Sequence, residues 1–377
     1  MTHAFRPLQA RFFTKITNAF TTATDSTAHS VLITHLLAER PAFINAVNTL
    51  TNIAAILPKP KSINEEALAT IAPTFRIDQL SRSDMAQAHY AVDYLRTVLG
   101  ERPGVLVDIG GYFAPVLTDI CQKLSGQILG VVEDTENGHR RYADIDDLPC
   151  PVVSVARSPL KQPEDVLVGQ SCAFSAEALM RSIGDLPVGR PVAVLGFGKV
   201  GRAAADTLRA KGSHVRVFDT DPIRAVQALS AGYSVTNTCT DAIRGACLVL
   251  CATGNRSLTA DEIAHLTNGA HVATVTSSDD ELDLSGARDY YESTTVAPDV
   301  QRWETPGHYF YLHNAGNAVN FIHGAVVGDF IYLVQAEILA AIARITQGTL
   351  TNNLSSMSAD TRRQIAEIWI DNYRSTT

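Results

Sequence analysis

The sequence predicts an α/β protein of two domains, and three observations support this prediction. The chain has 377 residues, which is more than a single small hydrophobic core usually accommodates. Short apolar runs alternate with segments of helical periodicity along most of the chain, as in parallel sheets covered by helices. A glycine-rich stretch connects one of these apolar runs to a helical segment near the middle of the chain.

The glycine-rich stretch follows an apolar run at residues 192–195. Three glycines come next in the spacing GxGxxG, and then a helical segment and a second apolar run. Glycines at these positions permit a tight turn, let a pyrophosphate approach the backbone, and let the helix pack closely on the sheet. Free N–H groups in the first turn of the helix attract phosphate. The stretch therefore predicts a Rossmann-type dinucleotide site with contacts from Gly196, Gly198, Lys199, Val200 and Gly201.

An acidic residue, Asp219, ends the second apolar run. A carboxylate at this position accepts hydrogen bonds from both ribose hydroxyls and repels a 2′-phosphate. We therefore expect NAD rather than NADP as the cofactor. Arg224, in the helical segment that follows Asp219, is a further predicted cofactor contact.

The first part of the chain, residues 1–180, is predicted to form most of a substrate-binding catalytic domain. Residues 1–60 and 83–99 have helical periodicity. Strands are predicted at residues 105–107, 129–132 and 152–155. Polar residues follow these strands, and residues just past the C-terminal ends of parallel strands line the crevice of a sheet. We expect substrate contacts there.

The rest of the chain is predicted to hold the NAD-binding domain, residues 181–318, and C-terminal helices, residues 319–377. Strands expected at residues 248–252 and 272–275 each end in polar residues. The cofactor contacts predicted after these strands are Thr253, Gly254, Asn255, Val275 and Thr276. The C-terminal helices should complete the substrate domain or form a subunit interface. The apolar segment 330–345 favours a homo-oligomer, because one short helical partner would not cover it.

The composition excludes several classes of protein. A net charge of -8 argues against nucleic-acid binding, which depends on Lys and Arg. No apolar run approaches the roughly 20 residues of a membrane span, and the N-terminus lacks a secretory apolar region. The six cysteines form no CxxC pair, so no metal site is predicted, and reduced thiols fit a cytoplasmic protein. The expected partner is a small-molecule substrate.

Several of these segments resemble the S-adenosylhomocysteine hydrolase family. The similar segments are VAVLGFGKVGR, VFDTDPIRAVQALSAGYSV, CATGN, DDELDL and GVVEDTENG, and the resemblance is strongest over residues 129–284. It resumes near residues 312–340, where Asn320 matches the residue that holds the nicotinamide carboxamide. Thr135 matches a threonine that contacts NAD.

The resemblance implies a particular chemistry. Family members keep NAD bound, oxidise the 3′-hydroxyl of the substrate ribose, eliminate the 5′-thiol, add water and reduce the ketone again. Lys161 and Asp165 match the lysine and aspartate that handle the ribose hydroxyls, and Asp134 matches an acidic ribose ligand. An exposed ion pair is the alternative for Lys161 and Asp165. His323 is the candidate for the family's late histidine, with packing as its alternative role.

Other positions depart from the family pattern. The second acid of its DDGG segment is Ile109, a substrate-contacting histidine is Ser277, and an early histidine aligns with Ala38. The cofactor site and the redox pair remain, whereas groups for 5′-elimination and hydration are missing. We therefore predict an NAD-dependent oxidoreductase that oxidises a hydroxyl of a nucleoside-like or other hydroxy substrate. The alternatives are a diverged S-adenosylhomocysteine hydrolase, a non-catalytic NAD-binding regulatory protein and, less favoured, an amino-acid dehydrogenase.

Overall fold

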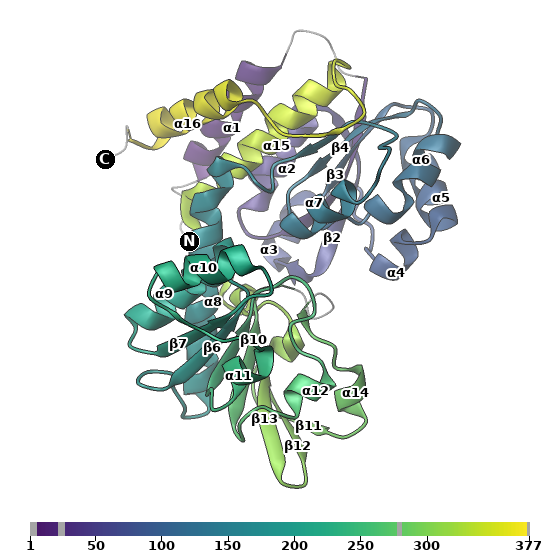
Figure 1. Ribbon diagram of the computed structural model, residues 1–377. Coiled ribbons are helices and arrows are strands. Elements are labelled where there is room, and N and C mark those ends of the chain that lie inside the picture. Colours follow the sequence, from purple (N-terminus) through teal and green to yellow (C-terminus); the bar gives the residue numbers. More distant parts are fainter. Residues whose placement is uncertain (1–5, 22–26, 277–280, 375–377) are drawn as a thin grey trace. The chain divides into compact units, whose positions relative to one another are not determined.

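The computed structural model describes residues 6–21, 27–276 and 281–374. The chain divides into two compact units (Figure 1). Unit 1 comprises Met1–Lys161 and Asp329–Thr377, and unit 2 comprises Gln162–Gly328. Each unit has its own sheet with helices packed on it. The predicted α/β class is confirmed, with one unit inserted into the other along the sequence and helices at the C-terminal end.

Unit 1 is built on a six-stranded parallel sheet. In spatial order its strands are β14 (Leu354–Ser355), β5 (Val152–Ser154), β4 (Ile128–Glu133), β3 (Gly104–Asp108), β1 (His29–Leu36) and β2 (Asn52–Ile63). Every residue of β3 is buried, as expected for a central strand covered on both faces. The three strands predicted in this part of the chain are confirmed.

The helical prediction for residues 1–60 is wrong for much of its length. Residues 29–36 and 52–63 form the neighbouring parallel strands β1 and β2. Nearly all of β1 is buried. A strand buried on both faces is apolar almost throughout, so the spacing of its apolar residues does not distinguish it from a buried helix.

The helices of unit 1 are α1 (Arg6–Phe20), α2 (Arg40–Leu50), α3 (Glu65–Ile71), α4 (Arg82–Met85), α5 (Ala88–Leu99), α6 (Leu117–Lys123), α7 (Glu136–Ala143), α15 (Ile331–Thr346) and α16 (Ala359–Tyr373). The apolar helix α15 packs against α1, α2, α16 and β4, as the upper part of Figure 1 shows. Its burial within unit 1 explains the apolar segment that favoured a homo-oligomer. Helix α16 begins after its N-cap, Ser358, whose hydroxyl accepts a hydrogen bond from Thr361 N.

Unit 2 is built on an eight-stranded sheet. In spatial order its strands are β11 (Glu292–Ala297), β12 (Val300–Thr305), β13 (His308–His313), β10 (Ala270–Thr274), β9 (Leu248–Cys251), β6 (Pro191–Leu195), β7 (His214–Phe218) and β8 (Ser234–Val235). The strands from β13 to β8 are parallel, whereas β11 and β12 are antiparallel additions. The sequence did not predict β11, which is mostly exposed and therefore lacks an apolar run.

The helices of unit 2 are α8 (Gln162–Ser182), α9 (Lys199–Ala210), α10 (Pro222–Ser230), α11 (Cys239–Ile243), α12 (Ala260–Ile263) and α14 (Ser285–Arg288). Helix α8 packs so closely on α9 that a Cβ on Gly169 would lie 2.5 Å from the carbonyl oxygen of Val200. This packing places α8 in unit 2. The division therefore falls after Lys161 and after Gly328, whereas the sequence placed it after residues 180 and 318. Among the described residues, none of the helices combines the length and the hydrophobicity needed to cross a bilayer.

Candidate functional site

The predicted cofactor contacts of unit 2 gather at one edge of its sheet. They follow the C-terminal ends of β6, β7, β9 and β10 or lie on the 3-10 helix η4 (Val319–His323): Gly196, Gly198, Lys199, Val200, Gly201, Asp219, Arg224, Thr253, Gly254, Asn255, Val275, Thr276 and Asn320. These four strands are parallel, so their C-terminal ends meet at the same edge. This edge is where open parallel sheets bind nucleotides.

The glycine loop between β6 and α9 has the shape that a phosphate site needs. Gly196 has φ of 93°, a conformation that L side chains rarely adopt. A Cβ on Gly201 would overlap the carbonyl oxygen of Gly196. In contrast, a Cβ on Gly198 would meet only the guanidinium of Arg224, at 3.6 Å or more. The loop therefore keeps room for a ligand in front of Gly198, at the N-terminus of α9.

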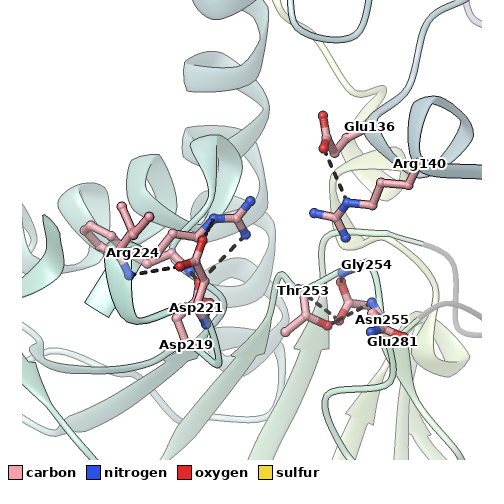
Figure 2. A network of polar contacts seen from close by, with 11 residues as sticks. Glu136, Arg140, Asp219, Asp221, Arg224, Thr253, Gly254, Asn255 and Glu281 are labelled. Atoms are coloured by element: carbon pink, nitrogen blue, oxygen red, sulfur yellow. Dashed lines mark hydrogen bonds and ion pairs between the residues drawn. The ribbon is translucent and has the colours of Figure 1, made fainter. Parts of the chain in front are cut away.

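Asp219 is fixed beside this loop (Figure 2). Its Oδ2 accepts a hydrogen bond from Phe197 N at 2.6 Å, and its Oδ1 accepts one from Asp221 N at 2.9 Å. The side chain is only 5% exposed. Each carboxylate oxygen has a second lone pair, so Asp219 retains acceptor capacity for two ribose hydroxyls.

A buried carboxyl group, Glu281, organises the neighbouring strand ends. Its oxygens accept hydrogen bonds from Thr253 N (3.1 Å), Thr253 Oγ1 (2.9 Å), Gly254 N (2.7 Å) and Thr276 Oγ1 (3.0 Å). Figure 2 shows Glu281 against Thr253 and Gly254, and burial raises the pKa of Glu281. From the sequence, only the acidic segment DDELDL was predicted to matter here. Glu281 is therefore a positioning residue that connects the loops after β9 and β10.

Glu281→Ala is expected to lower the free energy of unfolding by about 1–3 kcal/mol, because it leaves buried N–H groups without an acceptor. It should also weaken NAD binding, because the loops after β9 and β10 lose their shared support. Urea unfolding and NAD titration measure the two effects. Glu292→Ala, at an exposed position of β11 in the same unit, is the matched control. If both variants behave alike, Glu281 has no positioning role.

Asn320 and His323 lie on η4 in different surroundings. Asn320 is 4% exposed, and its Oδ1 is buried without a hydrogen-bond partner among the described residues. Buried carbonyl oxygens are normally paired, so Asn320 Oδ1 suits an amide N–H₂ such as that of a nicotinamide carboxamide. His323 Nδ1 lies 2.9 Å from Ser175 Oγ, and its ring packs edge-on against Phe174. These contacts match the packing alternative for His323.

The two predicted catalytic residues Lys161 and Asp165 have separate partners. In unit 1, Lys161 Nζ lies 3.0 Å from Asp134 Oδ1, and both side chains are 11% exposed. In unit 2, Asp165 Oδ2 lies 3.2 Å from Nζ of Lys199, which belongs to the glycine loop. The ion pair of Lys161 with Asp134 is too buried to be the solvated loop pair that was the alternative.

Two buried acids, Asp108 and Glu133, end the strands β3 and β4 of unit 1. Glu133 accepts hydrogen bonds from Gly110 N (3.1 Å), Gly111 N (2.9 Å), and both the N–H and the hydroxyl of Thr135 (2.7 Å each). Burial and the neighbouring Asp108 raise the pKa of Glu133 to about 8. Thr135, a predicted NAD contact, thus lies in unit 1 and caps α7. Glu133 was not among the site residues predicted from the sequence.

The raised pKa of Glu133 has a consequence for stability. Because Glu133 holds its proton more tightly in the folded than in the unfolded chain, it stabilises the fold below about pH 4.5. This contribution is lost as the pH rises through about 8. The free energy of unfolding of the unaltered protein should fall over this range. In Glu133→Gln this fall should be smaller by about 1 kcal/mol or more. Urea unfolding at several pH values measures the slope.

An exposed residue of the same unit, Glu101, provides the control for that experiment. Glu101→Gln should keep the slope of the unaltered protein. An identical slope in Glu133→Gln would show that Glu133 does not titrate in this range.

His35 lies at the C-terminal end of β1 and was not among the site residues predicted from the sequence. Its Nδ1 lies 2.6 Å from Ser62 Oγ. Burial, together with the charges of Lys59, Arg40 and Lys161, lowers the pKa of His35 well below its usual value. Its imidazole is therefore neutral at physiological pH and chemically able to accept a proton. The helical interpretation of residues 1–60 concealed its position at a strand end.

Ile109 and Ser277 are two of the positions that depart from the family pattern, and the structure describes only the first of them. Ile109, next to Asp108, is a buried apolar side chain with no group to transfer a proton. Ser277 lies outside the described residues.

Solved structures of two enzymes show partial likeness to the chain. Phosphoglycerate oxidoreductase from Vibrio cholerae has a TM-score of 0.38 and 13% identity, with 69% of this chain and 78% of that chain covered. D-lactate dehydrogenase from Escherichia coli has a TM-score of 0.38 and 13% identity, with 70% of this chain and 78% of that chain covered.

Sequence comparison gives a more specific result. Residues 171–325 match the family described as "S-adenosyl-L-homocysteine hydrolase, NAD binding domain". A curated adenosylhomocysteinase from Triticum aestivum is 31% identical over 192 residues, which cover 49% of this chain and 39% of the relative. The match thus spans well under half of that relative's length. It confirms the family resemblance and the NAD cofactor that the sequence predicted. Residues 171–325 are thus similar to the NAD-binding domain of the S-adenosyl-L-homocysteine hydrolase family.

Proposed function

We propose that the protein is an NAD-dependent enzyme that oxidises a hydroxyl group of a nucleoside-like or other hydroxy substrate. The observation that carries this proposal is the nearly buried pair of Lys161 and Asp134, 3.0 Å apart at the strand ends of unit 1. A lysine and a carboxylate in a poorly solvated site are suited to bind a hydroxyl and to move its proton. The NAD-binding domain in the same chain supports a redox use of this pair.

Oxidation of an alcohol removes a hydride from carbon and a proton from oxygen. NAD, when bound, supplies the hydride acceptor. Asp134 and Asp165 would accept hydrogen bonds from the substrate hydroxyls and fix their orientation. Lys161 Nζ would hold the reacting hydroxyl oxygen and, in its neutral form, take the proton as the carbonyl forms. Asn320 would hold the nicotinamide carboxamide, and Asp219 the adenosine ribose.

The buried Ile109 supports oxidation without the 5′-elimination of the related hydrolases. The acid that it replaces works at the substrate 5′ position in that family, and an isoleucine carries no exchangeable proton. A substrate oxidised at such a site would leave as a ketone or aldehyde, with NADH as the second product.

A second candidate function is a diverged S-adenosylhomocysteine hydrolase, and His35 favours it. Burial, with smaller effects of neighbouring positive charges that include Lys161, lowers the pKa of this imidazole well below its usual value. His35 would then supply the proton transfer that Ile109 cannot.

The most direct test of the cofactor assignment is the content of the purified protein. After denaturation, absorbance and mass spectrometry would reveal tightly held NAD, which supports an internal redox cycle. Reversible NADH binding to cofactor-free protein instead supports an ordinary dehydrogenase. If a panel of nucleosides and hydroxy acids leaves NAD oxidised while NAD binds normally, the oxidoreductase proposal fails and a regulatory role gains support.

We propose a small-molecule substrate, and a cytoplasmic location because all six cysteines are free thiols in the structure. Assembly into a homo-oligomer stays a prediction. Size-exclusion chromatography with light scattering would test it.

A further inference from the structure

Three basic side chains from separate segments of unit 1 gather at the loop that follows β3. Lys59 Nζ, from β2, lies 3.5 Å from the position that a Cβ on Gly110 would take. Arg141, on α7, donates a hydrogen bond from Nη1 to the carbonyl oxygen of Gly110. Arg82, the first residue of α4, lies over the ring of Tyr112, with its Cζ 4.4 Å from the ring centre. Lys59, Arg82 and Arg141 thus form one cation cluster.

The ring of Tyr112 attracts two of these cations. Besides Arg82, Lys59 Nζ lies over this ring, 5.7 Å from its centre. Tyr112 is only 8% exposed, and cation–π attraction is stronger where water is excluded. A guanidinium that lies on a ring keeps the N–H groups in its own plane for other acceptors. Within the described residues, Arg82 forms no ion pair with a carboxylate.

A bulge in β2 holds Lys59 at this edge of the sheet. The register of β1 against β2 shifts before Leu36, so residues 59–62 leave the regular ladder. Ser62 Oγ donates a hydrogen bond to the carbonyl oxygen of Lys59 at 3.2 Å and lies 2.6 Å from His35 Nδ1. The backbone of Lys59 is therefore fixed at the C-terminal end of β1.

The two acids that end β3 and β4 offset this positive charge only in part. Burial raises the pKa of Asp108, and burial together with the neighbouring Asp108 raises the pKa of Glu133 to about 8. Glu133 is therefore mostly protonated at neutral pH. Of these two acids, only Asp108 can then balance the cation cluster, and the loop after β3 keeps an excess of positive charge.

Hydrogen bonds connect the same loop to the pair of Lys161 and Asp134. Gly110 N donates a hydrogen bond to Glu133 Oε1 at 3.1 Å. Asp134 directly follows Glu133 in the chain and lies 3.0 Å from Lys161 Nζ. The cation cluster and this pair thus lie at the C-terminal ends of neighbouring parallel strands, where open parallel sheets bind their ligands.

We propose that the cation cluster binds an anionic group of the substrate, a carboxylate or a phosphate, while Lys161 and Asp134 hold the substrate hydroxyl. This proposal rests on the proposed function and narrows its substrate to hydroxy compounds that carry a negative charge. Arginine donates paired hydrogen bonds to the oxygens of either anion, and lysine adds a compact positive charge. A neutral hydroxy compound gains nothing from these charges and should bind more weakly.

Two pairs of probes test the proposal: ribose 5-phosphate against ribose, and glycerate against glycerol. Titration calorimetry is performed in the presence of NADH, so that the probes are not oxidised. The unaltered protein should bind the anionic member of at least one pair about tenfold or more tightly than the neutral member. A preference confined to the ribose pair identifies a phosphate as the bound group, and one confined to the glycerate pair identifies a carboxylate.

Variants then assign the preference to the cation cluster. Arg82→Gln and Lys59→Gln should each reduce it by about tenfold, because each removes one charge-assisted contact. Arg82→Lys keeps a cation over Tyr112 and should keep most of the preference, which guards against an effect of lost packing. Lys123→Gln, at an exposed position of α6 in the same unit, removes a positive charge elsewhere and should leave the preference unchanged.

Two results would overturn the proposal. One is equal or undetectable binding of the charged and neutral members of both pairs by the unaltered protein. The other is a preference that Arg82→Gln and Lys59→Gln both retain, which would show that these cations only pack on Tyr112. Neither result depends on turnover. Absence of NADH formation from every hydroxy compound, with normal NAD binding, would instead contradict the proposed function itself.

Discussion

Lys161→Met is expected to reduce hydroxyl oxidation by about a hundredfold to ten-thousandfold, which is the usual contribution of a positioned proton acceptor. NAD affinity should stay the same, because Lys161 is not among the predicted cofactor contacts and pairs with Asp134. The measurement is NADH formation with the best hydroxy substrate, alongside an NAD titration. Lys123→Met, on the exposed side of α6, is the control for loss of a lysine from the same unit.

Lys161→Arg separates proton transfer from charge pairing. Arginine would keep an ion pair with Asp134 but stays protonated at working pH, so it cannot accept a proton. We expect this variant to unfold like the unaltered protein and to be nearly as inactive as Lys161→Met. Substantial activity in Lys161→Arg would contradict the role of Lys161 as a base. Lys161 would then only orient the substrate hydroxyl.

Gly201→Ala is expected to abolish NAD binding and destabilise unit 2. The added Cβ would overlap the carbonyl oxygen of Gly196 and lie 3.1 Å from the Cβ of Ala252. These neighbours are the backbone of the turn and a residue that directly follows β9, so neither moves without displacing α9. Overpacking of this kind costs about 1–3 kcal/mol or more. Thermal unfolding and NAD titration measure the two effects.

Gly198→Ala is the matched variant in the same loop. Its Cβ would meet only the flexible end of Arg224, so the protein should fold with a stability close to that of the unaltered chain. NAD should nevertheless bind more weakly, because the methyl group projects into the space reserved for phosphate. If Gly198→Ala unfolds, or if Gly201→Ala binds NAD normally, the assignment of these two glycines is wrong.

The cofactor loop could be predicted because its determinants are local. The three glycines, the apolar run before them and Asp219 lie within a short segment, and each has a backbone or packing reason of its own. The strand β1 could not be distinguished from a helix, because burial on both faces removes the alternation of polar and apolar residues. The exposed strand β11 could not be predicted for a different reason, because it contains no apolar run.

The pairing of charged groups could not be predicted from spacing. Lys161 and Asp165 are neighbours in sequence, yet the structure pairs Lys161 with Asp134 and Asp165 with Lys199. Parallel strands bring distant segments to one edge, so the partners at that edge are set by strand order. The buried carboxyls Glu133 and Glu281 depend in the same way on donors from neighbouring loops.

The central claim is that the chain uses NAD to oxidise a hydroxyl without releasing a thiol. Incubation of the unaltered protein with S-adenosylhomocysteine, NAD and a thiol reagent tests it most directly, with NADH absorbance followed in parallel for S-adenosylhomocysteine and for a panel of hydroxy compounds. We expect no thiol release at an enzymatic rate, and NADH formation with at least one hydroxy compound. Thiol release at an enzymatic rate that is lost in Lys161→Met would contradict the claim and identify a hydrolase.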